Sequence, residues 1–309
     1  MTLLYYDDIF LEHETGGHPE NAGRVRAVTK RLKENKLLDR CTRPTWEPVT
    51  TQQATRVHEA EIIDAAREMA ASGGGMLDPD TVVSPRSVDA AKMATGAACD
   101  AVKRVVAGED KNALCLVRPP GHHATPNRQM GFCLLNNIAI AARVATKELG
   151  LNRVMIVDWD VHHGNGTQDV FWEDPQVGFL SMHRYPFYPG TGAADETGGG
   201  VGKGTVVNLP IRFGTLPVDQ LKGFRAEVEK LADKMKPELI LISAGYDSHV
   251  DDPIGSLQLE SEDFAMLSQI VLDVAKTHCE SRVVSLLEGG YNPDALAESV
   301  EFHLTELLK

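Results

Sequence analysis

Two carboxylates and two imidazoles directly follow an apolar segment in the middle of the chain. Residues 154–163 read Val-Met-Ile-Val-Asp-Trp-Asp-Val-His-His. In an extended chain, Asp158, Asp160 and His162 point to the same side, because alternate residues of a strand face the same way. Carboxylate oxygens and imidazole nitrogens are typical ligands of a divalent metal ion. We therefore predict a metal site at the end of a strand over residues 153–158.

Three further apolar segments end in residues that can do chemistry. Residues 113–117 lead into Arg-Pro-Pro-Gly-His-His, residues 238–243 into Ala-Gly-Tyr-Asp, and residues 282–287 into Glu-Gly-Gly-Tyr. Open parallel sheets bind their ligands at the carboxyl ends of the strands. We therefore interpret these four endings as parts of one site rather than as core packing.

The metal ligands predicted from the residues are Asp160 and His162, with Asp247 as the third because it ends another strand. Three protein ligands with an open fourth position describe a catalytic zinc site. Two oxygens and one nitrogen also suit iron or cobalt, so the identity of the metal stays open. Asp160 and Asp247 could instead cap the following helices, but capping does not require the Asp-x-His spacing.

His122 and His123 offer a general base and a general acid near neutral pH, provided that they lie opposite the metal. Each ring needs a polar partner that sets its tautomer, and we predict Asp158 for His122 and Asn165 for His123. An isolated pair of histidines is otherwise a common surface or core feature. Tyr291 follows two glycines, which let backbone come close to a ligand, and its phenol can donate a hydrogen bond to an oxyanion.

Strand-like and helix-like segments alternate along the chain. Apolar residues at helical spacing predict helices over 21–38, 84–106, 136–149, 217–235, 261–278 and 293–308. Apolar runs predict strands over 3–6, 113–117, 153–158, 177–181, 205–210, 238–243 and 282–287. Several of these runs are continuously apolar, as is typical of a parallel sheet covered on both faces. Without repeats or linkers, we predict one α/β domain over residues 1–309, with three α/β/α layers and a mostly parallel sheet.

Composition limits the class of protein. The chain has 309 residues, 42% of them hydrophobic, and a formal net charge of −13. This acidic balance argues against binding to nucleic acid. The five cysteines are scattered and form no C-x-x-C pair, which is typical of a reducing compartment. We find no signal peptide and no membrane-spanning segment, so we expect a soluble cytoplasmic protein without a membrane partner. Its oligomeric state stays open.

Seven motifs resemble those of the zinc-dependent histone deacetylase superfamily and follow each other in the order of that family. They are HPENAGR (18–24), RPPGHHA (118–124), GFCLLNNIAIAA (131–142), VDWDVHHGNGTQ (157–168), SMHRYPFYPG (181–190), AGYDSHVDDPIG (244–255) and EGGYN (288–292). RPPGHH and Asn165 are similar to the class II type and its bacterial relatives, which include acetylpolyamine amidohydrolases. Class I members usually have an aspartate in place of Asn165. The resemblance implies the arginase–deacetylase fold.

The resemblance also implies roles for these residues. His123 would act as general base and then acid, and His122 with Asp158 would adjust the electrostatics, although the sequence alone does not separate the two histidines. Tyr291 would donate to the oxyanion, and Arg24 matches the arginine near the acetate-release region. The zinc ligands would be Asp160, His162 and Asp247. A narrow tunnel would be lined by Gly131, Phe132, Phe187, Tyr188 and Ile254. A monovalent cation, K+ or Na+, would bind at Asp158, Asp160, His162, Ser181 and Met182. A second such site would lie around Phe171, Asp174 and Val177.

We therefore predict a zinc-dependent amidohydrolase that removes an acetyl or short acyl group from an N-acylated amine by attack of a metal-activated water molecule. Ile254 stands where polyamine-selective eukaryotic relatives have a glutamate, which favours acetyl-lysine over acetylpolyamine substrates. An acetylpolyamine amidohydrolase remains the alternative, because bacterial polyamine enzymes use a different acidic loop.

Two other readings fit the sequence less well. An arginase-like pair of manganese ions would need a D-x-H-x-D pattern, and Gly164 stands at its last position. A non-enzymatic protein that binds acyl-lysine or another small molecule would have no need of His122, His123 and Tyr291 together.

Overall fold

Eight parallel strands form the centre of the molecule. The computed structural model describes all 309 residues and orders these strands as β2-β1-β5-β10-β9-β6-β7-β8. Every pairing within this sheet is parallel. The strands are β1 (Thr2–Tyr5), β2 (Cys41–Thr42), β5 (Asn112–Cys115), β6 (Val154–Asp158), β7 (Val177–Arg184), β8 (Val206–Ile211), β9 (Leu239–Ala244) and β10 (Val283–Leu287).

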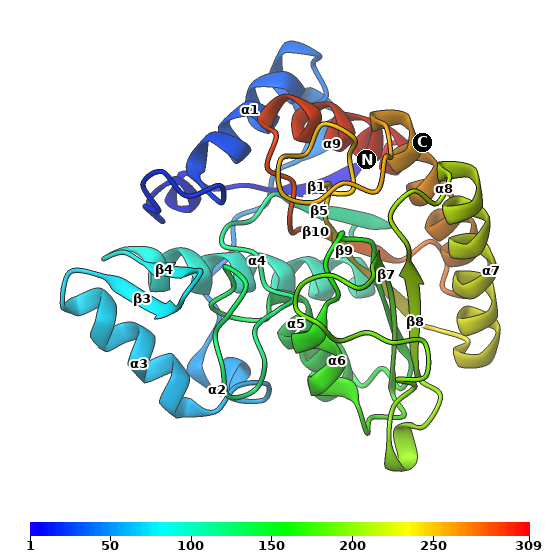
Figure 1. Cartoon of the computed structure of the whole chain (residues 1–309), viewed down its shortest axis with the longest axis horizontal. Coiled ribbons are helices and arrows are strands. Elements are labelled where there is room, and N and C mark those ends of the chain that lie inside the picture. Colours follow the sequence, from blue (N-terminus) through cyan, green and yellow to red (C-terminus); the bar gives the residue numbers. More distant parts are fainter.

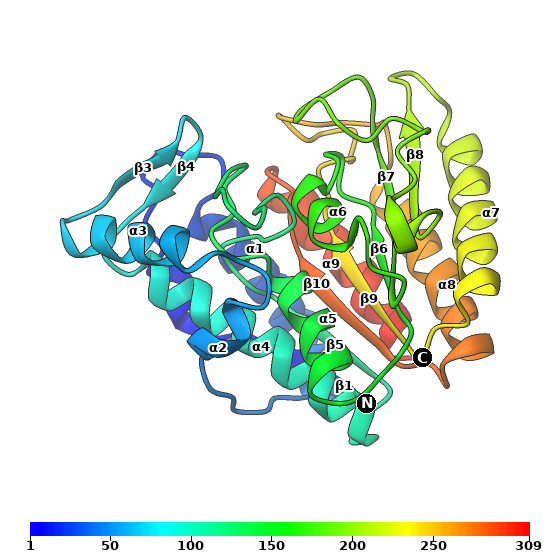
Figure 2. The same ribbon diagram turned by 90° about the horizontal axis from the view of Figure 1, so that it is seen from below.

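Helices cover both faces of the sheet, and each face has its own hydrophobic core of 39 buried residues (Figures 1 and 2). One face carries α2 (Thr51–Ala54), α3 (Ala60–Ala71), α4 (Ser87–Ala107), α5 (Asn137–Lys147) and α6 (Asn165–Phe171). The other face carries α1 (Ala22–Glu34), α7 (Pro217–Met235), α8 (Ser261–His278) and α9 (Pro293–Leu307). Short 3-10 turns cover Asp8–Leu11, Leu38–Arg40 and Gly200–Gly202. These three layers agree with the predicted fold class, and none of the helices has both the length and the apolar character that crossing a membrane requires.

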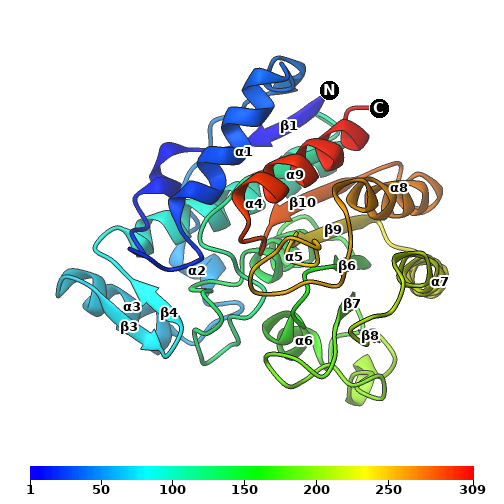
Figure 3. The same cartoon turned by 45° about the horizontal axis from the view of Figure 1, so that its top comes forward.

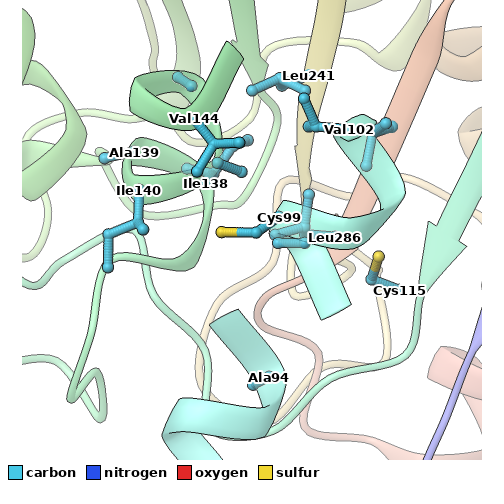
Figure 4. Close-up of a cluster of buried hydrophobic side chains, with 14 of the residues drawn as sticks. Ala94, Cys99, Val102, Cys115, Ile138, Ala139, Ile140, Val144, Leu241 and Leu286 are labelled. Atoms are coloured by element: carbon cyan, nitrogen blue, oxygen red, sulfur yellow. The ribbon is translucent and has the colours of Figure 1, made fainter. Parts of the chain in front are cut away.

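The core between α4 and α5 is built largely from small side chains. Figure 4 shows Val102 of α4 and Leu241 of β9 side by side, with Val144 and Ile138 of α5 across from them, and Ala94 farther along α4. Alanines let the two helices lie close together, so a dense core forms from residues that each bury little surface. The next element along the chain after α5 is β6. Its last residue, Asp158, is also the first residue of the 158–163 segment, which carries two of the predicted metal ligands.

The sheet order brings together the four strand endings that the sequence singled out. β5, β10, β9 and β6 are consecutive neighbours in the sheet, and all four run in the same direction. Their carboxyl ends therefore lie side by side. The loops that follow them carry the histidine pair, Tyr291, Asp247 and the 158–163 segment.

Some elements differ from the sequence prediction. The helix expected to run to Leu38 ends at Glu34, because Lys36 has a positive φ of 57° and Leu37 N bonds back to Leu32 O. This turn buries Leu37 against the neighbouring core. Figure 3 shows α1 beside α9, the helix on which it packs. Neither α3, α6 nor the antiparallel hairpin of β3 (Gly75–Asp78) and β4 (Thr81–Val83) was expected.

We predict opposite effects of the same substitution at two helical glycines. A methyl group at Gly96 of α4 would overlap the carbonyl oxygen of Glu47 and lie 3.0 Å from the Pro48 Cα, whereas at Gly223 of α7 its nearest neighbour is 3.7 Å away. Gly96→Ala should lower the free energy of unfolding by about 1–3 kcal/mol. Gly223→Ala should raise it by up to about 1 kcal/mol, because alanine favours the helix. Urea denaturation of both variants checks this, and a stabilising Gly96→Ala would contradict the close packing.

Candidate active site

The chain turns sharply after β6, and the turn itself is built by the acidic side chains. The Asp160 backbone N–H donates to Asp158 Oδ1 (3.1 Å), and the His162 N–H donates to Asp160 Oδ1 (2.9 Å). The strand ends at Asp158, so the expected extended alternation of the three side chains is wrong. They still reach one site, because these bonds direct Asp158 toward the histidine pair, and Asp160 and His162 toward Asp247.

Asp160, His162 and Asp247 form a compact, buried cluster. Their ligand atoms all lie within 4.8 Å of one another. His162 Nδ1 is 3.1 Å from Asp160 Oδ1 and 3.2 Å from Asp247 Oδ2. Asp247 Oδ2 accepts no well-formed hydrogen bond, although it is fully buried. Two carboxylates and one imidazole nitrogen thus point at the same small space.

The two carboxylates of this cluster are not neutralised by any basic side chain other than histidine. Neither of its carboxylates forms an ion pair with a lysine or arginine. Burial, and then the charge of Asp160, raise the pKa of Asp247 to about 7. Burial would lower the pKa of His162, but the two neighbouring carboxylates raise it to about 9. The donor set and its charge therefore fit a divalent metal.

Backbone groups and glycines shape the cluster. Gly289 N–H donates to Asp160 Oδ2 (2.9 Å), and Val161 N–H donates to Asp247 Oδ1 (2.9 Å). A Cβ atom at Gly289 would overlap Asp247 Oδ2, and one at Gly245 would overlap Asp160 Oδ2. The β9 and β10 endings can therefore approach the two carboxylates only with glycine at these positions.

The two histidines have the polar partners that the sequence suggested. His122 Nδ1 lies 2.9 Å from Asp158 Oδ2, and His123 Nδ1 lies 2.7 Å from Asn165 Oδ1. Burial would lower the pKa of His122, but the charges of Asp158 and Asp160 raise it to about 10. For His123, burial and then the neighbouring histidines hold the pKa well below its usual value. The pair is thus divided into one charged and one neutral ring.

A cavity of about 250 Å3 opens onto this cluster. His123, His162 and Tyr291 contribute to its wall. Phe187 stacks on the His162 ring at a centroid distance of 5.3 Å, and Tyr188 meets the His123 ring edge-on at 5.2 Å. The other lining residues are Asp80, Gly131, Phe132 and Ile254, so all five residues expected along the tunnel face this space.

Arg24 contacts both the ring of Tyr291 and the backbone just before it. The Arg24 guanidinium lies 4.9 Å from the centre of the Tyr291 ring, and its Nε donates to the Gly290 carbonyl (2.6 Å). The Tyr291 ring also meets Phe132 edge-on, with centroids 5.7 Å apart. Burial raises the pKa of the Tyr291 phenol well above its usual value, so the phenol keeps its proton. No other group of the chain hydrogen-bonds to its hydroxyl.

Of the residues expected at monovalent cation sites, Ser181 and Met182 lie beside the carboxyl end of β6, whereas Val177 lies at the amino end of β7. Ser181 Oγ is 3.0 Å from His183 Nδ1, and Met182 is fully buried beside it in β7. Farther from the cluster, Asp174 forms an ion pair with Arg143, whose guanidinium lies 4.6 Å from the centre of the Phe171 ring. Val177 begins β7.

Sequence reasoning missed two carboxylates of the site. Glu288 Oε2 accepts from the backbone N–H groups of Gly121 (2.7 Å) and His122 (3.2 Å), and so holds the histidine loop against β10. Asp80, in the turn of the unexpected hairpin, accepts from the Gly131 N–H (3.0 Å) at the cavity wall. Glu288 carries the same signal as Asp158, an acid directly after an apolar strand. Asp80 has no comparable signal.

Comparisons with known proteins agree with this geometry. A family model described as the histone deacetylase domain matches residues 18–307. The chain is 39% identical to an uncharacterised Synechocystis protein, and the alignment covers all of both chains. It is 37% identical to a probable deacetylase of Archaeoglobus fulgidus (94% of this chain, 82% of that protein) and 36% identical to the chloroplastic histone deacetylase 14 of Arabidopsis thaliana (99% and 76%).

The crystal structure of the HDA15 HD domain is similar to this one, with a TM-score of 0.93 and 35% identity over 99% of this chain and 88% of that chain. The family model, the relatives and the solved structure each match nearly the whole chain. The chain belongs to the histone deacetylase family and is a hydrolase of the deacetylase type.

Proposed function

We propose that this chain is a zinc-dependent amidohydrolase that removes acetyl or short acyl groups from N-acylated amines, with acetyl-lysine-type compounds as its preferred substrates. One observation carries the proposal: His162 of the metal cluster, His123 and Tyr291 line the same cavity of about 250 Å3. A metal ligand, a neutral histidine and a phenol around one small space supply the three functions that amide hydrolysis needs.

Asp160, His162 and Asp247 would hold the zinc ion. When bound, it supplies a Lewis acid for the amide carbonyl and lowers the pKa of a water molecule. Iron or cobalt would fit the same donors. Zinc is preferred because three protein ligands and an open position are typical of its catalytic sites.

The hydrogen bonds of the two histidines support different roles. Asn165 Oδ1 is an acceptor, so His123 Nδ1 carries the proton and Nε2 keeps a free lone pair. His123 can therefore take a proton from the attacking water and pass it to the leaving amine. His122, which Asp158 keeps protonated, has no free lone pair and instead stabilises the negative charge that develops beside it.

Tyr291 is suited to stabilise the tetrahedral oxyanion. Its hydroxyl is protonated and has no competing partner within the chain. Arg24, which lies against the face of the Tyr291 ring, and Phe132, which meets the ring edge-on, limit the movement of the ring. A donor that is already in position costs no reorganisation when the charge appears.

The lining of the cavity supports a neutral acyl amide as substrate. Phe132, Phe187 and Ile254 offer an apolar surface for an aliphatic chain. The alternative, an acetylpolyamine amidohydrolase, would need acidic groups for the second ammonium group, and Asp80 is the one acid that lines this space. The cytoplasmic location stays a prediction, and one relative is named as chloroplastic.

We also propose a structural K+ or Na+ near Asp158, Asp160, His162, Ser181 and Met182. Asp158 and Asp160 are buried, and no lysine or arginine neutralises them. At the second expected site, around Phe171, Asp174 and Val177, the Asp174 carboxylate is paired with Arg143, so a cation there would depend on other oxygens.

His162→Ala should abolish stoichiometric zinc binding. The variant removes the one nitrogen of the donor set and leaves Asp160 and Asp247 as the two remaining ligands. After chelation and reconstitution, elemental analysis should find one zinc per wild-type chain and none retained by the variant after dialysis. His278→Ala, at a histidine outside the site whose charged neighbour is Asp233 at 3.7 Å, should bind zinc like the wild type. Full zinc occupancy of His162→Ala would contradict the assigned ligands.

Tyr291→Phe should keep its zinc and lose most of its turnover. Loss of one oxyanion donor lowers kcat by about 10²–10³-fold in other hydrolases. We expect a similar loss with little change in KM, measured on an acetyl-lysine peptide. Tyr185→Phe, outside the cavity, serves as the control. An unchanged kcat of Tyr291→Phe would remove Tyr291 from the mechanism.

The substrate class is tested with acetyl-lysine peptides against acetylputrescine and acetylspermidine. The wild type should have the higher kcat/KM on the peptide. Ile254→Glu should shift the ratio toward acetylspermidine by up to about 5-fold, as expected for one partly exposed ion pair. Ile254→Leu should leave the ratio unchanged. A wild type that prefers acetylspermidine would favour the polyamine alternative.

A further inference from the structure

The carboxylate of Asp252 joins two loops that both contribute to the cavity wall, one through Ile254 and the other through Tyr291. Its Oδ1 accepts from the backbone N–H groups of Ile254 and Gly255, both at 2.9 Å. Its Oδ2 accepts from the backbone N–H of Tyr291 at 2.6 Å. Asp252 is only 8% exposed and forms no ion pair with a lysine or arginine. All of its hydrogen bonds therefore come from main-chain N–H groups.

Tyr291 needs such an anchor because regular secondary structure does not hold it. β10 ends at Leu287, and α9 begins at Pro293. Gly290, just before the tyrosine, has a φ of 116°, a conformation that glycine adopts at little cost. The ring has contacts with Arg24 and Phe132, and Arg24 Nε donates to the carbonyl oxygen of Gly290. Asp252 is the partner of the Tyr291 backbone N–H.

A local turn accounts for only part of this arrangement. An aspartate before a proline commonly closes a turn by accepting from the next N–H groups, as Oδ1 does here. The bond to Tyr291 joins residues 39 positions apart and serves no such turn. An asparagine could keep the turn with its own Oδ1, but its Nδ2 could not accept from the Tyr291 N–H.

We propose that Asp252 is a positioning residue that places Tyr291 for oxyanion donation and couples its position to the cavity wall at Ile254. The inference rests on the proposed function of Tyr291. It assigns to Asp252 no contact with substrate: the carboxylate acts through the tyrosine backbone. The Asn292 side chain adds a second tie between the loops, because its Nδ2 donates to the Asp251 carbonyl (3.1 Å).

Asp252→Asn tests this directly. Misplacement of a catalytic group by about 1 Å can cost about 100-fold in rate. We expect kcat on an acetyl-lysine peptide to fall by about 10- to 100-fold, with a much smaller change in KM and full zinc occupancy. Asp251→Asn, at the exposed neighbouring carboxylate that makes no side-chain hydrogen bond, should behave like the wild type. An Asp252→Asn variant with wild-type kcat overturns the proposal.

A double-mutant cycle separates positioning from a general loss of structure. If Asp252 acts through Tyr291, Asp252→Asn should cost little further kcat in the Tyr291→Phe background. Equal losses in both backgrounds overturn the proposal. If Asp252→Asn does not fold, hydrogen exchange of the wild type decides: the Tyr291 amide should be protected, and exchange at the rate of an exposed loop overturns it.

The outcomes also distinguish this inference from the proposed function. A zinc-loaded wild type that hydrolyses neither acetyl-lysine peptides nor acetylpolyamines removes the proposed function and this inference with it. An active wild type with an unaffected Asp252→Asn variant removes this inference alone.

Discussion

The structure depends on the burial of four carboxylates at the carboxyl ends of neighbouring strands. An ionised carboxylate away from water costs several kcal/mol unless other groups compensate it. No lysine or arginine forms an ion pair with any of the four, so backbone N–H groups and imidazoles take that part. The acids are Asp158, Asp160, Asp247 and Glu288. Their bonds tie the loop after β10 to Asp160, the loop after β6 to Asp247, and the histidine loop to Glu288. Charge neutralisation thus gives the loops their shape.

Two buried arginines, Arg24 and Arg118, pair with a different acid, Glu20, rather than with these four carboxylates. Arg118 and Arg24 both pair with Glu20, and these charges hold the pKa of Glu20 at about 2 although burial acts in the opposite direction. Arg118 also bonds the carbonyls of Phe10 and His13, so the N-terminal segment packs against the strand endings. Arg24 reaches the backbone of the Tyr291 loop. The two buried arginines are therefore neutralised by Glu20, and neither forms an ion pair with the carboxylates that would bind a metal.

The sequence allowed prediction of the residues that the strand order brings together, but not of the contacts between loops. An apolar run followed by Asp or His identifies a strand ending, and a parallel sheet then brings such endings together; this accounts for the cluster of Asp160, His162 and Asp247. The bond from Asp252 to Tyr291 and the contact of Asp80 with Gly131 join segments 39 and 51 residues apart, and no local pattern encodes them. The early end of α1 depends on Lys36, whose backbone is left-handed; a lysine at this position gives no sequence signal for that conformation. The roles of the site residues remain predictions.

Phe132 shows how the cavity wall is kept in place. Its φ is +69°, a region that costs a non-glycine residue about 1–3 kcal/mol and persists only where its surroundings determine it. Those surroundings are the unexpected hairpin, where Thr81 Oγ1 accepts from the Phe132 N–H and Asp80 from the preceding one. These two hydrogen bonds come from within the chain, so the backbone that carries the Phe132 ring is ordered before a substrate enters. The entropy of ordering this wall is lost when the chain folds and not each time a substrate enters, so the binding energy of a small acyl amine is left for its orientation.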